Sequence, residues 1–329
     1  MKTAEYVSPS HPDKICDQIS DSILDEALRQ DKSSRVAVEV MGGHGKIKIT
    51  GEITTEANLN YEDIAKRVYK DYGYEDKVDV EVNVTSQSAE IKSGVDSGGA
   101  GDQGIMIGYA CNENRFKIPQ EHLIARSLIE FVYKNKRVDA KSQVTISGDR
   151  VNCIVVSAAD IDTDSLKEMV NTWKRIDEPF IKRMNFEDCE IITNPAGDWS
   201  MSGFEADTGL TGRKVVVDSY GPRAPVGGGA FSGKDGTKVD RSGAYMARKI
   251  ALSYLEDREA REVLVKLGYV IGKSEPIMKR VLIDGEEEEI IGFDLKPEDI
   301  IKNLGLEKPI YNDLARWGHF GRNGFSWEN

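Results

Sequence analysis

Apolar positions near the start of the chain change their period repeatedly, and each change predicts a new element. Helical spacing predicts a helix over 12–29, and alternation with a period of two predicts strands over 35–41 and 46–54. The helical period returns over 61–72, and a half-buried strand follows over 78–84. The order is therefore helix, strand, strand, helix, strand.

The same order recurs twice, with little residue identity between the passes. The second pass predicts a helix, two strands, a helix and a strand over 120–134, 142–147, 151–158, 163–176 and 189–193. The third pass lacks a recognisable closing strand and predicts a helix, two strands and a helix over 239–255, 262–271, 277–283 and 297–304.

This repeat predicts three α+β units, each with helices on one face of a mainly antiparallel sheet. We expect their boundaries at 1–92, 98–201 and 202–329. The opposite sheet faces would then meet one another or a second subunit. Residues 311–329 hold two Trp and two Phe with few charges, which predicts a tail packed on the body of the protein.

Composition excludes several classes of protein. Of 329 residues, 39% are hydrophobic and 30% are charged, as in ordinary globular proteins. The apolar runs are far shorter than the ~20 residues of a membrane helix, and no signal peptide is recognisable. A formal charge of −12 disfavours nucleic-acid binding. The four cysteines form no Cys-x-x-Cys pair, so we expect no structural zinc and a cytoplasmic location.

Residues 10–14, Ser-His-Pro-Asp-Lys, open the first predicted helix. Ser10 is a suitable cap for that helix, which places His11, Asp13 and Lys14 at its N-terminus. Free N–H groups and the positive end of the helix dipole favour phosphate there. Asp13 is then a candidate for Mg²⁺ and Lys14 for a phosphate oxygen, although ordinary capping explains the segment equally well.

A denser candidate lies at 207–241, where glycines and cations coincide. The segment 207–214 leads into a predicted strand at 215–217, and a triple glycine follows at 227–229. The spacing of 228–234 matches a phosphate loop, but Asp235 stands where that motif needs Ser or Thr. We therefore reject a P-loop NTPase and expect another kind of polyphosphate cradle, or a solvated basic loop, built on five cations: Arg213, Lys214, Lys234, Lys238 and Arg241.

Other candidates are weak on composition alone. The glycine-rich residues 98–104 suit either a ligand loop or a plain loop. Asp139 and Lys141 suit a surface ion pair. Glu39 and Glu52 lie on predicted strands, where they are either solvated or balance a cation in a cleft.

Taken together, these segments resemble the S-adenosylmethionine synthetase (methionine adenosyltransferase) family. Eight segments match in family order, at 11–14, 51–55, 99–104, 139–143, 209–214, 227–235, 238–242 and 318–322. The resemblance implies an α+β fold of three interleaved βαββαβ units with pseudo-threefold symmetry, with sheets packed inward and helices outside. It also implies a compact family member, because the stretch between Gln87 and Gly101, where the family has a gating loop, is short.

The resemblance implies that methionine sulfur attacks C5′ of ATP to give S-adenosylmethionine, after which the released tripolyphosphate is cleaved to pyrophosphate and phosphate. A thioether needs no general base, so preorganised cations around the leaving phosphates are expected to contribute most. Two alternatives stay open. One is a related nucleotide-dependent transferase or tripolyphosphatase that acts on another thioether, and the other is a catalytically inactive binding subunit.

Carried over motif by motif, the resemblance also implies residue roles. The catalytic set is His11, Lys141, Arg213, Lys234 and Lys238. Further ATP contacts are expected at Asp139, Asp198, Trp199, Asp207, Lys214 and Ala230, and methionine contacts at Glu52, Gln87, Asp207 and Lys238. Asp13 and Asp240 are expected to bind Mg²⁺, with two ions per site, and Glu39 to bind K⁺. The expected assembly is a homodimer or a dimer of dimers, with active sites between subunits.

Overall fold

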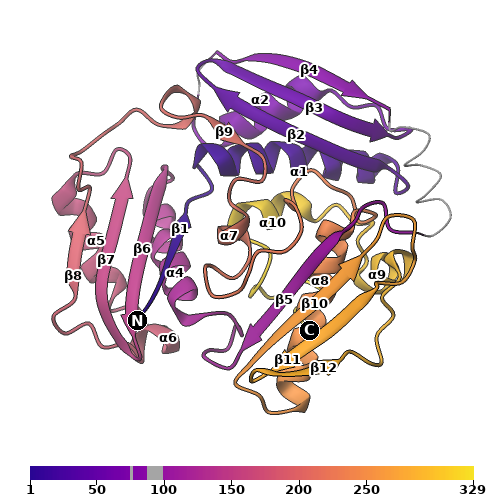
Figure 1. Cartoon of the computed structure of the whole chain (residues 1–329). Coiled ribbons are helices and arrows are strands. Elements are labelled where there is room, and N and C mark those ends of the chain that lie inside the picture. Colours follow the sequence, from indigo (N-terminus) through magenta and orange to yellow (C-terminus); the bar gives the residue numbers. More distant parts are fainter. Residues whose placement is uncertain (75–76, 87–98) are drawn as a thin grey trace.

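The computed structural model of the chain describes residues 1–74, 77–86 and 99–329, and within them three four-stranded sheets carry the fold (Figure 1). The first sheet has the order β9–β2–β3–β4, formed by Gly209–Leu210, Arg35–Gly43, Lys46–Thr54 and Asp79–Thr85. Helices α1 (Pro12–Gln30) and α2 (Tyr61–Asp71) cover one face of it. Strands β3 and β4 are parallel, and the other pairs are antiparallel.

The second and third sheets have similar plans. The second has the order β1–β6–β7–β8, formed by Lys2–Val7, Ala140–Ser147, Arg150–Ala158 and Glu190–Thr193. Its helices are α4 (Gln120–Asn135), α5 (Thr163–Trp173) and the short α6 (Pro179–Lys182). The third has the order β5–β10–β11–β12, formed by Gly104–Cys111, Glu262–Tyr269, Met278–Ile283 and Glu286–Glu289. Its helices are α8 (Val239–Asp257) and α9 (Pro297–Leu304).

Each sheet takes one strand from a distant part of the chain. Strand β1 pairs with β6, β5 pairs with β10, and β9 pairs with β2, all antiparallel. Each sheet therefore contains strands from two of the segments 1–92, 98–201 and 202–329 that the sequence predicted as units. The boundaries of these segments stay a prediction. This exchange of strands ties the three units together and carries loops from one unit onto the edge of another.

The mixed α+β class and the mainly antiparallel sheets are confirmed, and the predicted helices and central strands agree with the structure to within three residues at each end. One prediction is wrong: residues 215–217 form part of a short helix, α7 (Val215–Asp218), and not a strand. The β-branched run has no neighbouring strand to pair with. The N–H of Asp218 instead closes a helical turn on the carbonyl of Lys214, at 2.8 Å.

One face of each sheet packs on helices, and the other stays open. On β2, Val36, Val38 and Val40 are buried towards α1, whereas Glu39 is exposed on the opposite face. Figure 1 shows the helices of all three sheets gathered behind the strands. In the part of the chain that the structure describes, the sheets meet through helices and loops. The open faces of the described strands do not pack on one another.

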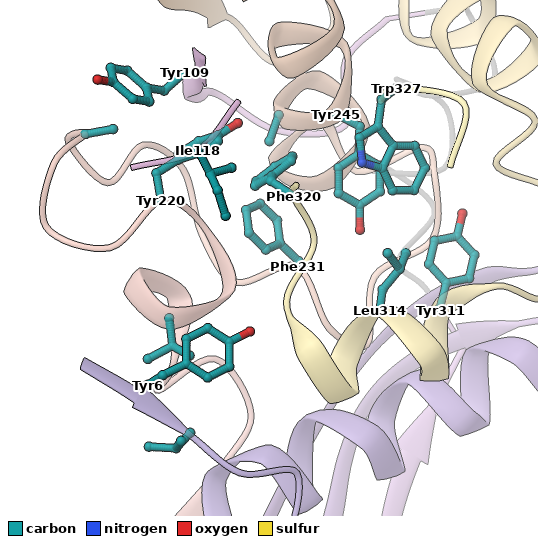
Figure 2. Close-up of a cluster of buried hydrophobic side chains, with 14 of the residues drawn as sticks. Tyr6, Tyr109, Ile118, Tyr220, Phe231, Tyr245, Tyr311, Leu314, Phe320 and Trp327 are labelled. Atoms are coloured by element: carbon teal, nitrogen blue, oxygen red, sulfur yellow. The ribbon is translucent and has the colours of Figure 1, made fainter. Parts of the chain in front are cut away.

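The C-terminal tail packs on the body of the protein, as its composition predicted. Helix α10 (Tyr311–Trp317) packs on α1, and the rings beyond it enter an aromatic cluster (Figure 2). Trp327 stacks on Tyr245 of α8 with ring centroids 4.0 Å apart, and Phe320 stacks on Tyr220 at 4.6 Å. Tyr6 of β1 and Tyr109 of β5 border the same cluster, so aromatic packing joins the three units.

No helix of the described residues is long and apolar enough to cross a membrane. The four cysteines are free, and Cys16 and Cys111 are buried, as expected for small apolar core residues.

Candidate active site

Helix α1 carries an aspartate at every fourth position: Asp13, Asp17, Asp21 and Asp25. Residues four apart lie on one face of a helix, so these carboxylates form a row, here called the aspartate ladder. Each is buried, and each accepts at least one backbone N–H bond from a distant segment of the chain. The donors to the first three, in order, are Leu210 at 2.9 Å, Gly212 at 2.8 Å and Gly233 at 2.8 Å. Asp25 accepts from Tyr311 and Asn312, both at 2.9 Å.

The aspartate ladder explains how two glycine-rich loops are positioned, namely the loop at 207–214 and the loop that follows the triple glycine at 227–229. A buried carboxylate needs hydrogen-bond donors, and backbone N–H groups of tight glycine-containing turns are well suited to supply them. Asp13 and Asp17 bind the loop that contains Arg213 and Lys214. Asp21 binds the loop that contains Lys234. Asp21 also forms a fully buried ion pair with Arg241 at 2.6 Å. Asp17 and Asp21 were not among the residues predicted from the sequence, although their four-residue spacing is visible there.

The first cluster of candidate groups lies at the N-terminus of α1 and consists of His11, Asp13, Arg213 and Lys214. We call it the α1 cluster. Lys214 Nζ lies 2.5 Å from Asp13 Oδ2, and Arg213 Nε lies 3.7 Å from Asp13 Oδ1. Asp13 is almost completely buried, whereas the Arg213 side chain is about half exposed, so the cluster opens to solvent on its cationic side.

His11, not Ser10, caps α1. Its Nδ1 accepts the N–H of Asp13 at 3.1 Å, whereas the buried Ser10 hydroxyl has no hydrogen-bond partner among the described residues. Because Nδ1 is an acceptor, a neutral His11 carries its proton on Nε2. Burial, followed by the positive charge of Lys214, lowers the pKa of His11 to about 4. His11 is therefore a neutral hydrogen-bond donor at physiological pH.

Asp139, Asp207 and Lys141 border this cluster. Asp139 is buried, and burial together with the negative charge of Asp207 raises its pKa to about 7. Asp207 and Lys141 both influence the pKa of His11, which places them near it. Lys141 Nζ lies 2.9 Å from Glu5 Oε2 of β1, and both side chains are about half exposed. The structure thus brings together the predicted residues of 11–13, 139–141 and 207–214.

The second cluster lies at the N-terminus of α8 and consists of Lys234, Asp235, Lys238 and Asp240. We call it the α8 cluster. Lys234 Nζ lies 2.6 Å from Asp240 Oδ2, and the N–H of Gly229 donates to Asp240 Oδ1 at 2.8 Å. Lys238 Nζ lies 2.6 Å from Asp235 Oδ2. Asp235 is the residue that departs from the P-loop motif. It is buried, and besides Lys238 it accepts the backbone N–H of Val36 in β2 at 2.7 Å.

A cavity of about 270 Å³ adjoins the α8 cluster on the open face of the first sheet. It brings together predicted residues from three parts of the chain, namely Glu39, Glu52, Ala230 and Lys234. Lys238 does not line this cavity, because its ammonium group turns to Asp235.

The two clusters lie at different places along the edge of β2. Gly42 pairs with Gly209 of β9, which leads into the loop of Arg213 and Lys214, and Ala37 bridges to Lys234. Five residues of strand separate these contacts, or about 17 Å along the edge. Within one chain, each cluster therefore presents its cations separately.

Several predicted residues have other roles or lie outside the description. Lys14 is fully buried between Asp17 and Asp218. The prediction that Lys14 faces a phosphate is therefore wrong. Asp198 accepts hydrogen bonds from Thr163 and Asn194, and the carbonyl of Trp199 accepts the N–H of Asp160 at 2.8 Å. Gln87 and the short gating segment lie largely outside the described residues.

The clusters also bear on metal binding. Within the described ranges, no group of three or more His, Cys, Asp or Glu side chains gathers as a metal site. Asp13 and Asp240 instead each present one carboxylate beside a lysine. This donor set fits Mg²⁺, which is bound through one or two carboxylates together with substrate phosphates and water.

The fold and these clusters are typical of an α+β enzyme that acts on a phosphorylated substrate. Comparison with known proteins gives the family. The N-terminal, central and C-terminal domain models of S-adenosylmethionine synthetase match residues 1–97, 97–199 and 201–329. The chain belongs to the S-adenosylmethionine synthetase family.

Individual relatives agree over nearly the whole length. The S-adenosylmethionine synthase of Mesoplasma florum is 40% identical, with 99% of this chain and 96% of that protein aligned. The enzyme of Pelagibacter ubique is 42% identical over 99% of this chain and 95% of its own. The solved structure of an unusual S-adenosylmethionine synthetase from Campylobacter jejuni covers all of this chain and 96% of its own, with a TM-score of 0.90 and 34% identity.

Family membership supports methionine adenosyltransferase activity, with ATP and methionine as substrates and dependence on metal ions.

Proposed function

We propose that the chain catalyses the reaction of ATP, L-methionine and water to S-adenosyl-L-methionine, pyrophosphate and phosphate, at a site composed of the α1 cluster and the α8 cluster. The observation that carries this assignment is the pairing of Lys214 with Asp13 and of Lys234 with Asp240 in two glycine-rich loops of an otherwise acidic protein.

In the first step the methionine sulfur forms a bond to C5′ of ATP. The bond from C5′ to the triphosphate oxygen breaks, and its electron pair leaves with the tripolyphosphate. The neutral thioether gives up no proton, so no residue has to act as a base. The chemistry instead requires positive charge at the departing oxygens, which Lys141, Arg213, Lys214 and Lys234 would supply.

His11 suits the oxygen at the breaking bond. Its Nδ1 is occupied by the helix cap, which leaves Nε2–H free to donate. The depressed pKa of His11 keeps this group neutral, so it adds a hydrogen bond without competing with the lysines for the anion. Asp139, Asp207 and Ala230 would contact the nucleotide. Asp198 and Trp199, which hold the neighbouring loop, stay weaker assignments.

The cavity of Glu39, Glu52 and Lys234 suits the methionine side. Glu52 would bind the methionine ammonium group, and Glu39 would bind K⁺. Gln87 and Lys238 stay predictions for the same side. Asp13 and Asp240 would each hold one Mg²⁺ through an oxygen now facing a lysine. Bound Mg²⁺ supplies charge neutralisation on the phosphates, and the second step, hydrolysis of tripolyphosphate, draws on the same cations.

We infer a homodimer or a dimer of dimers in which the α1 cluster of one subunit meets the α8 cluster of the other. The separation of the clusters along β2 and the open sheet faces support this arrangement. Exposed apolar side chains near the third sheet also support it: Ile105 is 50% exposed and Ile277 is 66% exposed.

A product assay with matched variants tests the assignment. Lys141→Ala and Lys234→Ala are expected to lower S-adenosylmethionine formation by about 100-fold or more each, because each removes a contact to the leaving group. The exposed pair of Lys141 and Glu5 contributes less than about 1 kcal/mol, so Lys141→Ala leaves the melting temperature nearly unchanged. The control Lys66→Ala removes an equally exposed pair on α2 and leaves turnover unchanged.

The alternatives have distinct outcomes in the same assay. Turnover close to that of wild type in both variants would overturn the assignment of the cations. Phosphate release from tripolyphosphate without S-adenosylmethionine formation from ATP and methionine would favour a related tripolyphosphatase or a transferase for another thioether. No product at high enzyme concentration would favour a binding subunit.

A further inference from the structure

A cavity of about 370 Å³ lies among the helices behind the first sheet, apart from both clusters. Four arginines from four segments line it: Arg29 of α1, Arg67 of α2, Arg137 before β6 and Arg316 of α10. We call it the arginine cavity. It shares no lining residue with the cavity of Glu39 and Glu52.

The guanidinium groups of the arginine cavity have unused donors. Within the described ranges, the exposed Arg67 and Arg137 make neither an ion pair nor a side-chain hydrogen bond. The buried Nε of Arg316 has no hydrogen-bond partner there either, as is also true of the Nε of Arg126 and Arg241. Three of the four guanidinium groups therefore keep donors that a bound anion can accept.

The carboxylates of the cavity do not neutralise these arginines. Both oxygens of Asp25 accept backbone N–H groups of α10, and burial raises its pKa to about 6. Within the described residues, Arg29 donates only from Nη1, to Glu26 at 2.8 Å. Asp71 is the other carboxylate of the lining. The arginine cavity is therefore positive in a protein whose formal charge is −12.

The geometry points to a polyphosphate anion as the ligand, and we propose that the arginine cavity binds two or more linked phosphates, free or as part of a nucleotide. Guanidinium groups pair with phosphate oxygens through two parallel hydrogen bonds. Cations that converge from four segments need an anion that reaches several of them, which a single small anion does not. This site is independent of the proposed active site, because none of its residues belongs to either cluster.

Equilibrium dialysis with labelled tripolyphosphate tests the proposal on the full chain. EDTA replaces Mg²⁺, so that the probe is not hydrolysed and metal-dependent binding at the clusters is suppressed. Wild type is expected to bind one tripolyphosphate per chain at the arginine cavity, and Arg67→Gln/Arg316→Gln is expected to bind it at least about tenfold more weakly for each guanidinium removed. The control Arg175→Gln changes an exposed arginine at the end of α5 and leaves the binding unchanged.

Two further measurements make the result decisive. The KM values for ATP and methionine are expected to stay within about twofold of wild type in the double variant, which separates this site from the active site. Arg67→Gln/Arg137→Gln changes only exposed side chains, so it repeats the test if the Arg316 substitution impairs folding. Displacement of the label by a non-hydrolysable ATP analogue identifies a nucleotide as the ligand, and failure to displace it identifies free polyphosphate. Unchanged tripolyphosphate binding in both double variants would overturn the proposal.

Discussion

His11 combines a structural and a chemical role in one ring. Nδ1 closes the first turn of α1, and this bond fixes which nitrogen carries the proton. Burial and Lys214 then keep the imidazole neutral far below its ordinary pKa. The residue thus presents a fixed, uncharged donor at the point where the helix dipole and Lys214 already provide positive charge.

The pKa of His11 predicts how this residue affects stability. In the unfolded chain the ring binds a proton below about pH 6.5, whereas in the folded protein it does so only near pH 4. Lowering the pH through this window therefore favours the unfolded state, and the His11 contribution falls by up to about 3 kcal/mol. His11→Asn keeps a capping oxygen and removes the titration.

Urea unfolding of wild type and His11→Asn at pH 7 and pH 4.5 measures this effect. The unfolding free energy of wild type is expected to fall relative to that of the variant as the pH is lowered. A constant difference between the two proteins at both pH values would show that His11 does not have the depressed pKa.

Helix α1 organises the candidate site as a single element. Its apolar face fills the core under the first sheet, and its ladder of aspartates fixes the backbone of both glycine-rich loops. The helix therefore couples packing to site geometry. The loops that carry the cations contain little regular secondary structure. Hydrogen bonds to buried carboxylates hold them in place of strand pairing.

Asp21 is the rung whose loss is expected to cost most. Asp21→Ala leaves Arg241 buried without its carboxylate, which costs about 3–5 kcal/mol of unfolding free energy. Adding Arg241→Met is expected to recover part of that loss, because the unpaired charge is then absent. Urea denaturation of the single and double variants measures both values, with Asp164→Ala at the exposed start of α5 as the control. A cost below 1 kcal/mol for Asp21→Ala would contradict the role of the pair.

At the scale of the whole molecule, strand exchange determines where the clusters lie. Because β9 leaves the C-terminal segment to pair with β2, the loop of Arg213 and Lys214 reaches the N-terminus of α1. The loop of Lys234 meets β2 farther along the same edge. In the proposed homodimer, each chain would offer two half-sites, which the two-fold symmetry would unite in pairs.

A complementation experiment tests this arrangement. His11→Asn and Lys234→Ala are each expected to be nearly inactive alone. In a randomly assorted mixture, half of the dimers contain one copy of each variant, and each of these has one intact site, so about a quarter of wild-type activity returns. The measurement is S-adenosylmethionine formation after co-expression, compared with a mixture made from each variant separately. No recovery would mean that both clusters serve a site within one chain.

The sequence alone determined the elements whose periodicity is local. Helices at 12–29 and 239–255 and the strand at 46–54 follow from the spacing of their apolar residues, which reports which face is buried. The motifs also determined the family, because eight segments match in order. Asp13 pairs with Lys214 and Asp240 with Lys234, and the roles of these four residues in metal and phosphate binding stay predictions.

Only the tertiary structure decided what depends on distant partners. The edge strands β1, β5 and β9 form because another unit offers an unpaired edge, and no local pattern encodes that pairing. The valines at 215–217 became helical for lack of such an edge. Lys14, which stands in a phosphate-binding motif, turns instead to two buried carboxylates that the chain supplies from α1 and α7. Side-chain chemistry can be read from a sequence, but the direction in which a charge points is fixed by the groups that folding places around it.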